Sequence, residues 1–223
     1  MKSRILAIKL TPNRLVKAFL IVAILVFLAY LFYLNARVVG YFSQSNDVIK
    51  IQYNQQNKVA INMLLLIEDR SFFNHFGVDF KEVVRVFRDY WLQDKPLRGA
   101  STLTQQLIKN NLLTREQTMS RKLNEALMAL LLELSFDKQF ILNYYMNSVY
   151  LGQKGNLSIN GFDQAAQFYF NKKIDDLALE EVATLVALVK GPSYYHPIKH
   201  PERLAKRKQL VLSLYHKHKK IVK

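Results

Sequence analysis

The sequence contains no cysteine and few glycines and prolines. Its 223 residues include 7 glycines and 5 prolines, and they show no internal repeat and no low-complexity tract. The lack of cysteine excludes disulfide bonds and thiolate metal sites, and it is compatible with either side of a membrane. Because glycine and proline interrupt regular elements, their scarcity agrees with the helical periodicity that dominates after residue 58. These features predict a mostly α fold.

Acidic residues are also scarce. There are 17 of them against 32 lysines and arginines, which gives a net charge of +15. A basic balance of this size suits nucleic acid, an anionic membrane surface or a phosphorylated substrate. Half of the residues are hydrophobic, so disorder is not expected, and the length allows one domain with a core plus an appendage.

The N-terminal part of the chain is basic first and uncharged next. Residues 1–17 carry lysine and arginine but no acid, and a mainly apolar segment follows over residues 18–36. It approaches the ~20 residues that span a bilayer, and its basic flank predicts a cytoplasmic N-terminus. A cleaved signal peptide is the main alternative, but no convincing small-residue cleavage site follows, and a buried soluble helix is a third option. We predict an uncleaved signal anchor and then a polar connector, residues 37–57, with strand-like pieces over residues 48–53.

An apolar helical run, residues 59–67, leads directly into an acidic pair, Glu68 and Asp69. A carboxylate at the end of an apolar helix is partly desolvated, which makes it a better proton acceptor near neutral pH. The alternative for Glu68 is a surface acid paired with Arg70. His75, further along, is more typical of a hydrogen-bonded structural histidine than of a ligand.

Residues 99–110 combine small, hydroxyl and amide side chains with one cation. Ser101 and Thr102 are good N-cap residues, and a helix starting there would direct free N–H groups and its positive dipole end at a ligand. Gln105, Gln106 and Lys109 would follow at one-turn spacings. This arrangement suits an anionic, hydroxyl-rich ligand. The alternative is an ordinary amphipathic helix with a buried apolar face.

Two further segments combine basic and apolar residues. Residues 80–92 are typical either of a helix on a membrane surface or of a helix whose apolar face is part of the core. A capping-box pattern over residues 114–117 predicts the start of another helix. On that helix Arg121, Lys122 and Glu125 can share one face, either as a site or as solvated ion pairs.

Helical patterns continue toward the C-terminus. The helices expected there cover residues 136–149, 162–170 and 179–190. The last of these is apolar on nearly all sides, so we predict that it is buried, with Lys190 at its end. Residues 151–159 contain glycine and predict a loop, and Pro201 predicts the first position of the final helix. Together these elements complete one domain, residues 58–215, before a basic tail, residues 216–223.

Together these motifs resemble those of the peptidoglycan glycosyltransferases (glycosyltransferase family 51), the lysozyme-like domain of bifunctional penicillin-binding proteins and of their monofunctional relatives. The matching segments, in the family's order, are Glu68-Asp-Arg-x-Phe-x-x-His75-x-Gly77-x-Asp79, residues 99–110, Arg121-Lys122-x-x-Glu125-Ala126, Ile141-Leu142-x-x-Tyr145-x-Asn147 with Tyr150-Leu151-Gly152, and residues 183–192. In detail the motifs are closest to the bifunctional class B-type enzymes of Gram-negative bacteria. The chain is therefore expected to be a natural short form or the N-terminal part of a longer protein.

The resemblance implies a reaction and a set of site residues. In this family the 4-hydroxyl of lipid II attacks the anomeric carbon of a growing glycan chain, inverts it to a β-1,4 linkage and expels undecaprenyl pyrophosphate. Glu68 matches the general base, and Glu125 matches a second essential glutamate. The residues implied in substrate binding are Ser101, Thr102, Gln106, Lys109, Asn110, Arg121, Lys122 and Lys190. No cofactor is fixed by the resemblance, which leaves a divalent cation such as Mg²⁺ or Mn²⁺ open.

The implied fold is a lysozyme-like helical domain with a small membrane-associated lobe, residues 80–92, preceded by one transmembrane helix. Expected partners are lipid II, the growing glycan chain, membrane lipid, and cell-wall synthesis and division proteins. Nucleic acid is disfavoured, because a single-pass protein of the inner membrane would place its catalytic domain in the periplasm. Two alternatives stay open: a membrane-anchored lysozyme-like enzyme that cleaves glycan, which has no need of a cationic pocket, and an inactive cell-wall scaffold.

Overall fold

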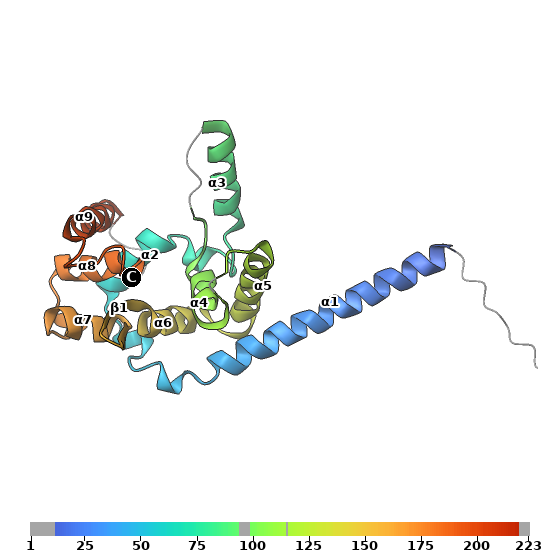
Figure 1. The fold of residues 1–223 in the computed structure, drawn as a ribbon, viewed down its shortest axis with the longest axis horizontal. Coiled ribbons are helices and arrows are strands. Elements are labelled where there is room, and N and C mark those ends of the chain that lie inside the picture. The colour runs from blue at the N-terminus through green and yellow to red at the C-terminus, as the bar shows by residue number, and fades with distance from the viewer. Residues whose placement is uncertain (1–11, 94–98, 115, 219–223) are drawn as a thin grey trace, which may run out of the picture.

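The computed structural model describes residues 12–93, 99–114 and 116–218, and it consists of a helical body from which one long helix extends (Figure 1). The helices are α1 (Pro12–Phe42), α2 (Lys58–Glu68), α3 (Phe80–Gln93), α4 (Leu103–Leu112), α5 (Met119–Ser135), α6 (Lys138–Ser148), α7 (Phe162–Phe170), α8 (Leu179–Val189) and α9 (Pro201–His218), and the strands are β1 (Tyr150–Lys154) and β2 (Leu157–Asn160). The predicted mostly α fold class is confirmed. Most of the predicted basic N-terminal segment and the end of the predicted tail lie outside the described residues.

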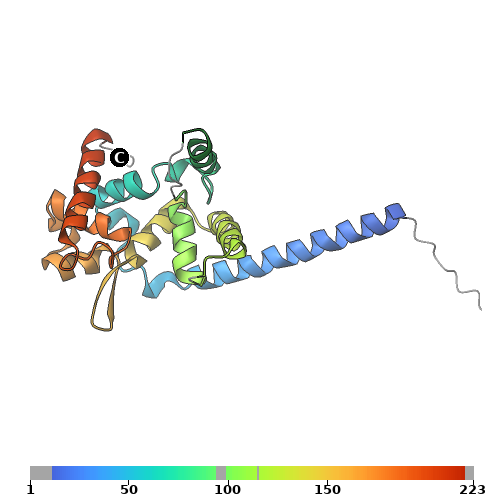
Figure 2. The same cartoon turned by 45° about the horizontal axis from the view of Figure 1, so that its top comes forward.

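Helix α1 projects away from the helical body in both views (Figures 1 and 2). From Leu15 to Tyr33 its large apolar side chains are exposed, except for the partly buried Leu31. Within the described residues it is the one helix that is long and apolar enough to cross a membrane. Near its C-terminal end, Leu34, Val38 and Phe42 follow one another at four-residue spacing and are buried. The helix therefore continues into the residues predicted to form a polar connector, because this stripe packs into the core.

Polar contacts also join the C-terminal half of α1 to the helical body. The Tyr30 hydroxyl donates to Asn124 Oδ1 on α5 at 2.7 Å. The Arg37 guanidinium donates to the carbonyl of Leu112, the last residue of α4, at 2.9 Å, and so satisfies one of the free carbonyls at that helix end. The Tyr41 hydroxyl donates to Asn111 Oδ1 at 3.0 Å. Helix α1 is thus attached to the two helices, α4 and α5, that carry most of the predicted site residues.

The prediction of strand-like pieces over residues 48–53 is wrong. The side chain of Asn147 on α6 binds this segment instead: its Oδ1 accepts from the backbone N–H groups of Lys50 and Ile51 at 3.1 and 3.0 Å. Its Nδ2 donates to the Ile51 carbonyl at 3.0 Å. A single amide side chain therefore satisfies backbone groups that would otherwise require a neighbouring strand.

Helix α2 lies in the core of the domain, where it packs against α8 and α9. Its buried apolar residues are Ala60, Ile61, Met63, Leu64, Leu65 and Leu66. The prediction that α8 is buried is confirmed, because Val182, Ala183 and the run 185–188 have almost no exposed surface. This packing fixes the position of the C-terminal end of α2, which is Glu68.

Helix α3 stands apart from the rest of the domain (Figure 1). Phe80, Val84, Phe87 and Trp91 share one face at three- and four-residue spacings, and each is more than half exposed. The alternative that this face belongs to the core is therefore wrong. Asp79 immediately precedes the helix and caps its first turn: its Oδ1 accepts from the Glu82 N–H at 2.9 Å, and its other oxygen accepts from the Ser71 hydroxyl.

Two local predictions are also wrong. Helix α5 begins at Met119 rather than within residues 114–117, because Thr118 is its N-cap and accepts from the Arg121 N–H at 3.2 Å. Residues 151–159 belong to an antiparallel hairpin of β1 and β2 rather than to a loop. The pair Gly155-Asn156 connects the strands, and Gly155 has a φ of 57°, which is the left-handed conformation that a two-residue hairpin turn requires.

Candidate active site

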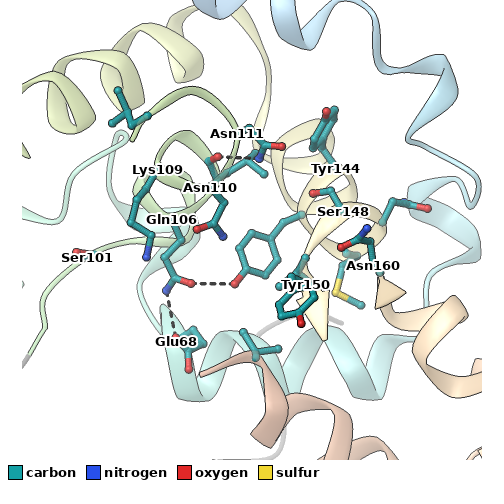
Figure 3. A pocket seen from close by; sticks show the side chains of 18 of the residues that line it. Glu68, Ser101, Gln106, Lys109, Asn110, Asn111, Tyr144, Ser148, Tyr150 and Asn160 are labelled. Atoms are coloured by element: carbon teal, nitrogen blue, oxygen red, sulfur yellow. Dashed lines mark hydrogen bonds between the residues drawn. The ribbon is translucent and has the colours of Figure 1, made fainter. Parts of the chain in front are cut away.

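A cleft of about 1790 Å³ runs between the ends of several elements of the domain (Figure 3). Its walls include the C-terminal end of α2, helix α4, the start of α5, the C-terminal half of α6 and the end of α8. The predicted site residues that line it are Glu68, Ser101, Gln106, Lys109, Asn110, Arg121, Lys122, Glu125 and Lys190. Segments that are far apart in the sequence are therefore brought together in one cavity.

Thr102 is the predicted site residue that does not line this cleft. It is buried and is the N-cap of α4, where its Oγ1 accepts from the Gln105 N–H at 3.1 Å. The same hydroxyl donates to the Gly77 carbonyl at 2.6 Å. Both bonds are within the protein, and Thr102 acts as a helix cap.

Asp69 joins the end of α2 to the start of α4. Its Oδ2 accepts from the Leu103 N–H at 2.8 Å, where the positive end of the α4 dipole favours a carboxylate. Because a carboxylate only accepts, His75 donates to it through Nε2, at 3.0 and 3.1 Å from the two oxygens. The prediction of a structural His75 is confirmed. This junction holds Glu68, the neighbour of Asp69, beside α4.

The Glu68 carboxylate accepts hydrogen bonds at both of its oxygens. Gln106 Nε2 donates to Oε2 at 3.1 Å, as Figure 3 shows, and the Arg207 guanidinium on α9 donates to Oε1 at 3.1 Å. The Glu68 side chain is only 5% exposed. The alternative of a surface acid paired with Arg70 is therefore wrong. The observed partner, Arg207, is not among the predicted site residues.

Tyr145 on α6 fixes the orientation of Gln106. Since Glu68 takes the Gln106 amide as a donor, the Gln106 carbonyl oxygen is left to accept from the Tyr145 hydroxyl at 2.8 Å. Burial, together with the negative charge of Glu68, raises the pKa of Tyr145 well above its ordinary value. The hydroxyl therefore stays protonated and remains a donor. The sequence places Tyr145 in a family motif but indicates no contact for it.

A second buried carboxylate, Glu125 on α5, is paired with two cations. Arg121 donates to its Oε2 at 2.8 Å, and the Lys122 ammonium contacts its Oε1. Lys122 also donates to Ser101 Oγ at 2.8 Å. Glu125 is 1% exposed, so the cluster is not a set of solvated ion pairs. The buried carboxylate fixes both cations in the cleft wall, and their charge exceeds its own.

The donor set around Glu125 does not fit a divalent cation held by protein side chains. Both carboxylate oxygens already bind cationic groups. Across residues 12–93, 99–114 and 116–218, no group of three or more histidine, aspartate or glutamate side chains has the geometry to bind a metal. The remaining cations that line the cleft are Lys50, Lys109 and Lys190. The cleft therefore combines a buried proton acceptor with cations suited to an anionic ligand.

Comparison with known proteins agrees with this geometry. The model of the transglycosylase family matches residues 35–216. The chain belongs to the transglycosylase family. The match includes both buried carboxylates and all of the cleft residues named above, and it confirms the resemblance to the glycosyltransferase domain of class A penicillin-binding proteins.

Several curated relatives are similar to most of this transglycosylase chain. Penicillin-binding protein 1B of Haemophilus influenzae is 42% identical over 179 residues, which is 80% of the chain and 23% of that protein. Penicillin-binding protein 1A of Aquifex aeolicus is 45% identical over 153 residues, which is 69% of the chain and 20% of that protein. Penicillin-binding protein 1B of Escherichia coli is 42% identical over 156 residues, which is 70% of the chain and 18% of that protein. The aligned part of the chain thus spans less than a quarter of each of these relatives.

Proposed function

We propose that this chain polymerises lipid II into β-1,4-linked glycan strands and releases undecaprenyl pyrophosphate. The observation that carries the proposal is that one cleft contains a buried carboxylate, Glu68, and fixed cations around a second carboxylate, Glu125. A transfer that expels pyrophosphate needs a proton acceptor for the attacking hydroxyl and positive charge for the leaving group. Cleavage of glycan by water would need no such cations.

In the proposed step, the oxygen of the acceptor 4-hydroxyl forms a bond to the donor anomeric carbon while the bond from that carbon to the pyrophosphate oxygen breaks. The configuration at the carbon inverts. The hydroxyl proton passes to Glu68, and the electron pair of the broken bond leaves with the pyrophosphate. A carboxylate offers about four acceptor positions, so Glu68 can bind the hydroxyl while Gln106 and Arg207 occupy two of them.

The cations have a separate part in the proposed step. Lys109, Arg121, Lys122 and Lys190 would stabilise the negative charge that develops on the pyrophosphate. Glu125 would position Arg121 and Lys122 for this purpose, because its buried carboxylate binds both. The side chains proposed to contact sugar or phosphate are Ser101, Gln106 and Asn110.

The membrane has a part in the proposed function as well. We place α1 across the inner membrane with a cytoplasmic N-terminus, and the exposed apolar stripe of α3 against the same bilayer on the periplasmic side. Confinement of enzyme and lipid-linked substrate to one surface raises their effective concentration. Cell-wall synthesis and division proteins would meet the enzyme in the same membrane.

The test is polymerisation of purified lipid II in detergent by the unchanged chain, by Glu68→Gln and by Glu180→Gln. Glu180 is exposed in the first turn of α8 and gives a matched control for the substitution. We expect polymer from the unchanged chain and from Glu180→Gln, and a rate lower by on the order of 10²- to 10⁴-fold for Glu68→Gln. Polymer at equal rates from all three would remove Glu68 as the base. No polymer from the unchanged chain, or shortening of preformed glycan, would overturn the proposed reaction.

A further inference from the structure

Arg207 occupies the buried face of α9. Leu204 and Val211, three residues before and four residues after it, are buried where α9 packs on α2 and α8. A residue at these spacings points to the same side of a helix. The Arg207 side chain is 17% exposed, whereas its neighbour Lys206 is exposed. A cation thus lies in an apolar stripe, directed at the C-terminal end of α2.

Glu68 lies where a negative charge is unfavourable unless a cation is close to it. Glu68 is the last residue of α2, where the negative end of the helix dipole opposes a carboxylate. Its side chain is almost entirely removed from water, which also opposes charge. The contacts from α4 and α6 are neutral: Gln106 donates one hydrogen bond, and Tyr145 acts through Gln106. Arg207 provides the ion pair of Glu68.

We propose that Arg207 is a positioning residue for Glu68, an inference that rests on the proposed function. Arg207 does not line the cleft, so it acts on the substrate through Glu68 rather than by contact. With Arg207 at Oε1 and Gln106 at Oε2, the carboxylate cannot turn without losing a hydrogen bond. Helix α9 therefore provides the countercharge and fixes the orientation of the group that accepts the proton.

The experiment measures kcat and KM for lipid II polymerisation by the full chain in detergent, with Arg207→Met, Arg207→Lys and the matched control Lys206→Met. Methionine retains an apolar stem in the packed stripe but removes the charge and the donors. We expect Arg207→Met to lower kcat on the order of 10²-fold, the loss typical of a misplaced reacting group, with KM little changed. Arg207→Lys recovers most of this loss, and Lys206→Met behaves as the unchanged chain.

Circular dichroism and thermal unfolding are measured for each variant to check that it folds. If Arg207→Met does not fold, Arg207→Gln is used in its place. The inference is overturned if the neutral variant retains the unchanged kcat, if its loss lies in KM alone, or if Lys206→Met loses as much. No polymer from the unchanged chain overturns the proposed function and this inference with it. Polymer from the unchanged chain and from the folded neutral variant at equal kcat overturns the inference alone.

Discussion

Removal of a single hydroxyl, in Tyr145→Phe, tests whether α6 orients the proposed base. The Tyr145 hydroxyl is buried and donates to Gln106, which in turn donates to Glu68. Phenylalanine keeps the packed ring but leaves the Gln106 carbonyl without its donor. An unsatisfied acceptor costs about 1–3 kcal/mol. Because Gln106 lines the cleft and water can reach it, we expect the lower end, about 1 kcal/mol.

That free energy has two measurable consequences. For a chain of this size, a loss of about 1 kcal/mol lowers the thermal midpoint by about 2–4 °C. If the same free energy is lost from the orientation of Glu68 in the transition state, kcat falls about 5-fold. Thermal unfolding in detergent measures the first consequence, and the rate of lipid II polymerisation measures the second.

Tyr169→Phe is the matched control, because the Tyr169 hydroxyl donates to the Leu151 carbonyl at 2.9 Å, a contact that does not involve Glu68 or Gln106. We expect a similar loss of stability in this variant with an unchanged kcat. The reasoning is refuted if Tyr145→Phe polymerises lipid II at the full rate, or if Tyr169→Phe loses as much kcat.

Two further predictions concern α3. Trp91 is the single tryptophan and is exposed, so brominated lipid in a reconstituted bilayer should quench its emission. The substitution Phe87→Glu on the same face should weaken this quenching. Equal quenching in the unchanged chain and in Phe87→Glu would contradict contact of this face with lipid. Burial acts to raise the pKa of Asp79, but hydrogen bonds from Ser71 and the Glu82 N–H lower it below its ordinary value. The ionised form therefore adds stability that is present above a pH of about 4 and is lost on further acidification. Between about pH 6 and pH 3, the thermal midpoint of Asp79→Asn should fall less than that of the unchanged chain, and equal falls would contradict this.

Local signals were sufficient for much of the fold. A hydroxyl residue before an apolar run predicts the N-cap at Thr102, and a proline predicts the start of α9 at Pro201. The hairpin had a local signal too, since Gly155-Asn156 is a pair typical of two-residue turns. Its strands of 5 and 4 residues are too short to show a clear alternation in the sequence.

The contacts around Glu68 could not be predicted in the same way. Arg207 is 139 residues from Glu68, and Tyr145 is 39 residues from Gln106. Such contacts depend on how α6 and α9 pack against the rest of the domain, and periodicity within one helix carries no information about that packing. The spacing of Arg207 from Leu204 and Val211 indicates that Arg207 faces inward. It does not indicate which residue Arg207 contacts.

With α1 placed across the membrane as proposed, the unbroken course of this helix would set the height of the cleft above the bilayer. The exposed apolar stretch ends at Tyr33, and Tyr41, which lines the cleft, follows eight residues later on the same helix. At 1.5 Å per residue this is a rise of about 12 Å. No flexible joint lies between the two points, because the helix runs on to Phe42. In the proposed placement the cleft therefore lies close to the membrane surface, where it would meet sugars that are still attached to their lipid.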